Sequence, residues 1–223
     1  MASPLSSANA MPFERLQLDE NSWVDIARNF LTYLNADAQE VFETVRDQTD
    51  WYQGNVFRYE RNIPERRLSA SSRSNSEIPH DAIRTTWRKL QHHYGIQFTG
   101  YALSYYRNEN DLLAMHRDRD MRWLDRTVIA LLVLGARRPF HLSPRHASST
   151  SNTSTAALHD LAPGEGDLIV MGGACQENWL HGVPGVSKPT GGRISVQWRW
   201  TAKSGRPQIG PGYRAPRYFS RGA

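Results

Sequence analysis

The sequence predicts an α+β fold with a β-sandwich or jelly-roll core. Helical spacing of apolar residues dominates much of the first 94 residues, and short aromatic and β-branched runs separated by turn residues follow. The 223 residues, of which 39% are hydrophobic, are enough for one domain, or one domain plus an extension. No internal repeat is evident.

Two helical segments are predicted in the N-terminal half. Residues 1–18 look like a loose leader, and residues 19–49 are expected to be helical, with a break into two pieces at 36–37. The apolar residues that recur near helical spacing in this segment are Leu31, Leu34, Val41, Phe42 and Val45. After Pro79, residues 81–94 predict a second helix.

Strand-like runs fill the rest of the chain up to residue 200. They are aromatic and β-branched and occupy residues 98–106, 127–134, 140–143, 167–171 and 194–200. The Ser/Thr-rich stretch 146–157 is expected to be an exposed hairpin tip, and residues 204–223 to be a tail rich in Gly, Pro and Arg.

Composition narrows the class of protein. The net charge of +5 and pI near 9.5 favour an anionic partner such as nucleic acid. The single cysteine, Cys175, excludes a disulfide framework within the chain and fits a reducing cytoplasm. Residues 1–20 do not resemble a secretory signal, and no run reaches the roughly 18 apolar residues of a membrane span. A monomer is expected.

One short motif suggests a metal site. In an extended chain His116 and Asp118 point to the same face, so both can reach one ion. His181 follows far downstream, after an apolar strand and a turn-like stretch. Two His and one carboxylate form the facial triad of iron(II) oxygenases, which leaves three positions open on the metal. Taken alone, an H-x-D pair or a single histidine more often consists of ordinary surface or core residues than of metal ligands.

A strand-like run near residue 200 carries two arginines. Arg193 and Arg199 are six residues apart, so both face one side of a strand, with Ser195 and Gln197 between them. An arginine that points into a β-core requires an anion, and guanidinium matches carboxylate bidentately. The pair therefore suggests a dicarboxylate ligand, or one ligand carboxylate plus a protein carboxylate. The alternative is an exposed strand face with two solvated arginines.

Four motifs occur in order: SYYRNENDLLAMHRDRD, TVIALLVLGARRPFHL, GDLIVMGGACQENWLHGVPG and GRISVQWRW. Together they closely resemble the AlkB family of nucleic-acid dealkylases, most of all its bacterial branch, over residues 95–201 and more weakly back to residue 19. The resemblance implies a double-stranded β-helix with iron at its mouth, N-terminal helices and a nucleotide-recognition lid. It also implies Fe(II), the co-substrate 2-oxoglutarate and O2.

The resemblance assigns roles to single residues. His116, Asp118 and His181 correspond to the iron ligands and, with Arg199, form the catalytic set. Residues at the co-substrate are, by the same resemblance, Tyr106, Ser104, Arg193, Ser195 and Arg199. Ser104 and Ser195 stand where the family has Asn, and they offer fewer hydrogen bonds. Asp120 matches a family position near the target base.

The lid is expected at residues 51–76, where aromatic residues alternate with arginines. Such a segment suits stacking on a flipped base and contact with phosphates. The candidate substrate-binding residues there are Trp51, Tyr52, Phe57, Arg58 and Tyr59. The alternative is that the aromatic rings pack under the lid. The chain thus divides into an extension (1–50), a lid and helix (51–94), the oxygenase core (95–203) and a tail (204–223).

The function that the resemblance implies is oxidative dealkylation of N-alkylated bases, such as 1-methyladenine and 3-methylcytosine, in DNA or RNA, with release of formaldehyde and succinate. A first alternative is the same oxygenase chemistry on a small metabolite or a protein side chain. A second is a basic nucleic-acid-binding module with a vestigial iron site. Because the triad and both arginines are present, the sequence favours an enzyme.

Overall fold

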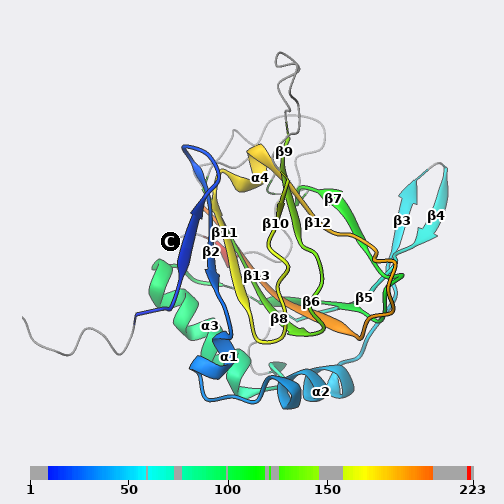
Figure 1. Ribbon diagram of the computed structural model, residues 1–223, viewed down its shortest axis with the longest axis horizontal. Helices are drawn as coiled ribbons and strands as arrows, with labels where there is room; N and C mark the ends of the chain where they lie inside the picture. Colours follow the sequence, from blue (N-terminus) through cyan, green and yellow to red (C-terminus); the bar gives the residue numbers. More distant parts are fainter. Residues whose placement is uncertain are drawn as a thin grey trace, which may run out of the picture.

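Two β-sheets face each other, and helices cover the outer face of the larger sheet (Figure 1). This computed structural model describes residues 10–58, 60–72, 77–98, 100–118, 121, 126–145, 158–202 and 220–221. The arrangement confirms the predicted α+β class and jelly-roll core.

The larger sheet has eight strands. Seven of them follow one antiparallel path: β1 (Glu14–Gln17), β2 (Ser22–Ala27), β11 (Leu168–Gly173), β8 (Thr127–Gly135), β13 (Arg193–Thr201), β6 (Tyr101–Tyr106) and β5 (Leu68–Ser72). The eighth, β14 (Ser220–Arg221), lies parallel to the end of β13.

The smaller sheet has four antiparallel strands: β10 (His159–Asp160), β9 (His141–Pro144), β12 (Trp179–Val183) and β7 (Leu113–His116). A separate hairpin of β3 (Asn55–Arg58) and β4 (Arg61–Pro64) projects beyond the two sheets in Figure 1. It lies in the segment that was expected to form the lid.

The helices begin and end where local signals place them. In α2 (Ala38–Gln48) the Asp37 side chain accepts hydrogen bonds from the backbone N–H groups of residues 39 and 40, which confirms the predicted break at 36–37. Helix α3 (Asp81–Tyr94) has the predicted bounds and ends at Gly95, whose φ of 64° suits glycine. The short helices are α1 (Phe30–Tyr33) and α4 (Cys175–Asn178). Within the described ranges, no helix is long and apolar enough to cross a membrane.

The prediction of helix from residue 19 is wrong for its first part. Residues 22–27 form β2, which hydrogen-bonds to β11 on one side and to β1 on the other, so part of the expected leader is also strand. The buried Asp25 of β2 receives two hydrogen bonds from Arg15 and one from the Tyr94 hydroxyl. Long-range pairing therefore overrides the local apolar spacing. Strands from the extension (β1, β2), from the lid segment (β5) and from the tail (β14) all join the sheet of the oxygenase core.

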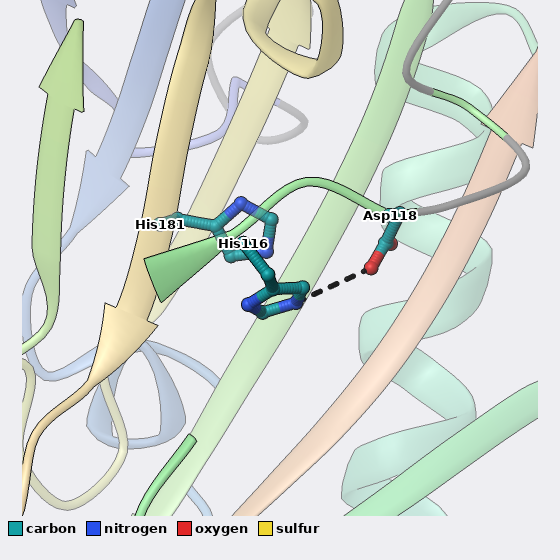
Figure 2. A group of neighbouring side chains, drawn as sticks. All are labelled: His116, Asp118 and His181. Atoms are coloured by element: carbon teal, nitrogen blue, oxygen red, sulfur yellow. Dashed lines mark ion pairs between the residues drawn. The ribbon is translucent and has the colours of Figure 1, made fainter. Parts of the chain in front are cut away.

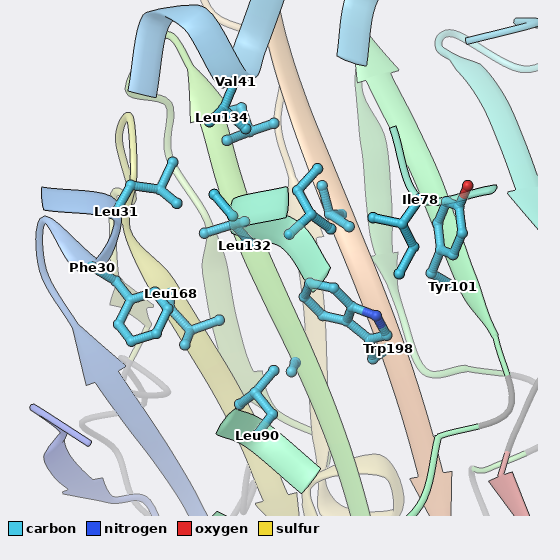
Figure 3. Packing of buried hydrophobic residues seen from close by; sticks show 14 of the residues in the cluster. Phe30, Leu31, Val41, Ile78, Leu90, Tyr101, Leu132, Leu134, Leu168 and Trp198 are labelled. Carbon is cyan, nitrogen blue, oxygen red and sulfur yellow. The ribbon is translucent and has the colours of Figure 1, made fainter. Parts of the chain in front are cut away.

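One face of β13 packs against the helices, and the other faces the smaller sheet. Ile194, Val196 and Trp198 pack with helix residues in the core between the larger sheet and the helices (Figure 3). The alternate positions 193, 195, 197 and 199 face the opposite side, toward the smaller sheet. A second core cluster, which includes Tyr106, Ile129 and Leu142, fills part of the space between the two sheets. The candidate site lies on this inner side.

Candidate active site

The three predicted metal ligands lie together. Strand β7 ends at His116, and His181 is its partner on the neighbouring strand β12 (Figure 2). The ring centroids of the two histidines are 4.3 Å apart, and His116 Nε2 lies 3.5 Å from Asp118 Oδ1. One ligand atom from each of the three residues lies within 4.8 Å of the others. The turn-like stretch expected before His181 is instead helix α4 and the start of β12.

The chemistry of these groups suits a divalent metal. His116 Nδ1 lies 2.9 Å from the carbonyl oxygen of Ala114, which can only accept, so Nδ1 carries the proton and Nε2 keeps its lone pair. Burial lowers the pKa of His181 to about 3 and keeps that imidazole neutral. Phe140 stacks on the His181 ring at 6.0 Å. Two imidazoles and one carboxylate form the donor set that iron(II) oxygenases use.

Asp118 is fixed at both its side chain and its backbone. Arg199 Nε donates to Asp118 Oδ2 at 2.7 Å. Burial alone would raise the pKa of Asp118, but the charge of Arg199 holds it well below its usual range. The Asp118 N–H donates to Gln176 Oε1 of α4 at 2.8 Å, and Arg117 donates to the Glu177 carbonyl of the same helix. These neighbouring residues therefore keep the carboxylate ionised and oriented.

Arg193 lies inside the protein, as predicted. It is fully buried, and its three guanidinium nitrogens find no hydrogen-bond acceptor among the residues that the structure describes. Its guanidinium lies 5.3 Å from the centre of the Tyr106 ring. Burial lowers the pKa of Arg193 to about 10, and Tyr106 opposes that change. A buried cation whose three nitrogens have no acceptor among these residues fits a ligand carboxylate.

A second buried arginine, Arg138, was not foreseen from the sequence. It also lies near the Tyr106 ring, at 5.6 Å, but its guanidinium donates to the carbonyls of Asn108, Asp111 and Pro184. Its charge contributes to the lowered pKa of Arg193. The two arginines give this end of the site a positive potential that suits a dianion. The sequence gives no signal for the role of Arg138, because its acceptors are backbone carbonyls, which every residue has.

The remaining predicted co-substrate residues line the same face of the sheet. Tyr106, Ser104 and Ser195 are all buried, and Arg193 is the direct partner of Tyr106 in the β13–β6 register. Gln197 donates to Ser104 Oγ at 2.9 Å and accepts from Arg199 Nη2 at 2.6 Å. The structure thus brings all the predicted co-substrate residues onto neighbouring positions of β6 and β13.

The predicted substrate-binding residues are more scattered. Trp51 donates from its indole to the Arg46 carbonyl and lies 5.2 Å from the Tyr105 ring, which favours the packing alternative for this residue. Tyr52 has 56% of its surface exposed. The backbones of residues 57 and 58 lie in β3. Outside the described residues or side chains fall Phe57, Arg58, Tyr59, Asp120 and the stretch 146–157.

Cys175 is not suited to catalysis. It is buried on α4, and burial raises the pKa of its thiol to about 12. The Sγ donates to the carbonyl of Trp23. Cys175 is therefore a small core residue and not a nucleophile.

Comparison with known proteins identifies the family. Residues 24–199 match the family model described as the 2OG-Fe(II) oxygenase superfamily, which is more than half of the chain. The chain belongs to this superfamily. Its cofactors are therefore Fe(II), 2-oxoglutarate and O2, and the protein is a dioxygenase. The donor set around His116 fits the metal, and the guanidinium of Arg193, which has no acceptor in the described part of the chain, fits the co-substrate.

Relatives within the superfamily confirm the AlkB resemblance. The chain is 27% identical over 121 residues to human alpha-ketoglutarate-dependent dioxygenase alkB homolog 3, covering 54% of this chain and 42% of that protein. It is 25% identical over 178 residues to the rat protein of the same name, covering 73% of this chain and 59% of that protein. It is 27% identical over 120 residues to the Arabidopsis thaliana DNA oxidative demethylase ALKBH2, covering 47% and 38%. The chain thus spans between 38% and 59% of the length of these relatives.

A solved structure shares the fold. A prolyl hydroxylase from Trichoplax adhaerens, in complex with a hypoxia inducible factor peptide fragment, aligns with a TM-score of 0.55 at 14% identity. The alignment covers 79% of this chain and 82% of that one. At this identity the likeness concerns the jelly-roll architecture alone.

Proposed function

We propose that this dioxygenase removes alkyl groups from the nitrogens of nucleic-acid bases, with 1-methyladenine and 3-methylcytosine in DNA as the first candidates and RNA as a second substrate class. The observation that carries the proposal is the similarity to AlkB homologues, one of which is named a DNA oxidative demethylase. The net charge of +5 also suits a polyanionic substrate.

The residues of the site divide into three groups by what they hold. His116, Asp118 and His181 would hold the iron, since their donor atoms lie within 4.8 Å of one another. Arg193 and Tyr106 hold the far carboxylate of 2-oxoglutarate. When bound, iron and 2-oxoglutarate supply the oxidising chemistry with O2, so that the alkyl carbon leaves as formaldehyde and the co-substrate as succinate and CO2. Arg199 keeps Asp118 ionised and fixed throughout.

The protein contributes orientation and exclusion of water. Phe140 packs on the His181 ring, and Phe140, Tyr106 and Arg193 are all buried, so they exclude solvent from the inner side of the site. For the nucleic acid we assign the segment around the β3–β4 hairpin, where Tyr52 and Arg61 are exposed. Asp120 is assigned to the positively charged methylated base, which a nearby carboxylate favours.

The decisive experiment measures formaldehyde and succinate with Fe(II), 2-oxoglutarate and air. A 3-methylcytosine oligonucleotide is compared with its unmethylated twin, and His116→Ala is the blank. The proposal expects formaldehyde that requires the methyl group, the iron and His116. Succinate without methyl-dependent formaldehyde would instead place the substrate among small metabolites or protein side chains.

Two variants separate substrate binding from co-substrate turnover. Tyr52→Ala removes an exposed ring, so it should raise KM for the oligonucleotide while succinate formed without substrate stays unchanged. Asp120→Asn should lower turnover of the charged bases more than succinate formation. Equal losses in both reactions would contradict the assignment of these residues to the nucleic acid.

A further inference from the structure

A chain of hydrogen bonds connects two strands to the Asp118 carboxylate. Gln197 Nε2 donates to Ser104 Oγ at 2.9 Å, and Arg199 Nη2 donates to Gln197 Oε1 at 2.6 Å. Arg199 Nε then donates to Asp118 Oδ2 at 2.7 Å. Gln197 and Ser104 are buried, with 8% and 6% of their surface exposed. Water therefore competes little for these bonds.

The direction of each bond follows from the chemistry of the groups. A guanidinium has only donors, so the amide oxygen of Gln197 must face Arg199. The amide nitrogen then faces Ser104, whose hydroxyl oxygen accepts. A flipped amide would place its N–H groups against the guanidinium and leave buried donors without acceptors, which is costly. Ser104 and Arg199 together thus fix one orientation of the Gln197 amide.

The geometry of β13 makes Gln197 the link. Residues 197 and 199 point to the same face of the strand, so the Gln197 side chain lies beside that of Arg199. Ser104 pairs with position 195, one step along the same face, and lies diagonally across from Gln197.

We propose that Gln197 is a positioning residue for the metal site. By holding Nη2 of Arg199, it fixes the rotation of the guanidinium and so directs Nε to Asp118 Oδ2. The other carboxylate oxygen, Oδ1, is then the one that approaches His116 Nε2 and is presented to the metal. The inference rests on the proposed assignment of Asp118 as a ligand, and it adds a residue that touches neither metal nor substrate.

The test uses Co(II), which binds such sites without oxygen chemistry and absorbs visible light. Gln197→Met keeps the length of the side chain and removes both hydrogen bonds. We expect its Co(II) affinity to fall about tenfold, as for other residues that orient metal ligands. We also expect the visible Co(II) spectrum to change, because Asp118 is free to turn. Ser104→Ala, a smaller change, should lower the affinity about threefold through the same amide.

Thr201→Val is the matched control. Thr201 is buried on the same face of β13, two residues beyond Arg199, and takes no part in the hydrogen-bond chain. Its Co(II) affinity and spectrum should equal those of the wild type. Affinity within twofold of the wild type for both Gln197→Met and Ser104→Ala, with unchanged spectra, would overturn the proposal. If Gln197→Met does not fold, Ser104→Ala decides alone.

The same titration separates this inference from the assignment of the metal site. His116→Ala should abolish the Co(II) spectrum of the wild type. If the wild type binds Co(II) no differently from His116→Ala, the assignment of the metal site is wrong. If binding depends on His116 but not on Gln197 or Ser104, only the positioning role is wrong.

Discussion

Replacing Arg193 with methionine should stabilise the protein when 2-oxoglutarate is absent. Arg193 is fully buried, and its nitrogens find no acceptor among the described residues. Burial lowers its pKa from the ordinary value to about 10, which corresponds to about 3 kcal/mol against the charged form at 1.36 kcal/mol per pKa unit. Met fills much of the same volume without a charge. Allowing for the lost contact with Tyr106, we expect a gain of about 2 kcal/mol, or a Tm higher by about 4–8 °C.

Adding 2-oxoglutarate should make the wild type more stable than Arg193→Met. At about one hundred times its Kd, 2-oxoglutarate stabilises a protein that binds it by about 2.7 kcal/mol, and Arg193→Met should lose that gain. The assay is thermal unfolding with Co(II) present, in a buffer without small carboxylates, with and without 2-oxoglutarate. Wild type should be the less stable protein without 2-oxoglutarate and the more stable one with it.

Arg138→Met is the control for this reasoning. Arg138 is as deeply buried and as close to Tyr106, but it donates to three backbone carbonyls. Its loss leaves those carbonyls unsatisfied, so it should destabilise the protein by about 3 kcal/mol or more in either condition. If Arg193→Met destabilises the ligand-free protein as Arg138→Met does, Arg193 is paired within the fold and is not held ready for a ligand carboxylate.

Three further changes test other parts of the structure. Asp111→Asn should lower Tm at pH 7. Burial would raise the pKa of Asp111, but the ion pair with Arg107 outweighs burial and lowers that pKa. The difference in Tm between variant and wild type should therefore shrink as the pH falls below about 4 and through the folded-state pKa, which melts at several pH values would show. Gln176→Met, which frees the Asp118 N–H, should weaken Co(II) binding about tenfold in a titration, whereas equal affinity would exclude the helix α4 contact from the site. Asp167→Ala should cost about 3 kcal/mol in urea unfolding, because it removes the acceptor of the backbone N–H groups of Asn29 and Gly164; a loss below about 1 kcal/mol would refute this.

Elements with local signals were predicted well. Helix α3 has both of its ends marked nearby: the His80 side chain accepts from the N–H of Ala82, and Gly95 ends the helix in a left-handed conformation. Strand β13 was predicted from its aromatic and β-branched residues, and the even spacing of Arg193 and Arg199 predicted that both lie on one face of it. In both cases the information lies within about fifteen residues.

Strand β2 shows where local information fails. Trp23, Val24 and Ile26 fit a helical stretch as well as a strand, because a short apolar run has no clear period. The choice is made by β11, far away in the sequence, which provides a continuous set of backbone partners for residues 22–27. Strand β12 was missed for a similar reason, since its register is set by β9 and β7 on either side.

In the candidate site, the residues that bind a ligand could be predicted from the sequence, and the residues that support them could not. Groups that bind an ion or an anion must be particular side chains, so His116, Asp118 and the arginines of β13 could be found by type and spacing. Gln176 and Arg138 act instead through backbone groups, at Asp118 N–H and at three carbonyls. Any residue offers such backbone groups, so a side chain that uses them leaves no pattern in the sequence. The ligands of this oxygenase are therefore visible in its sequence, whereas the residues that hold them in place become visible only when the sheets are assembled.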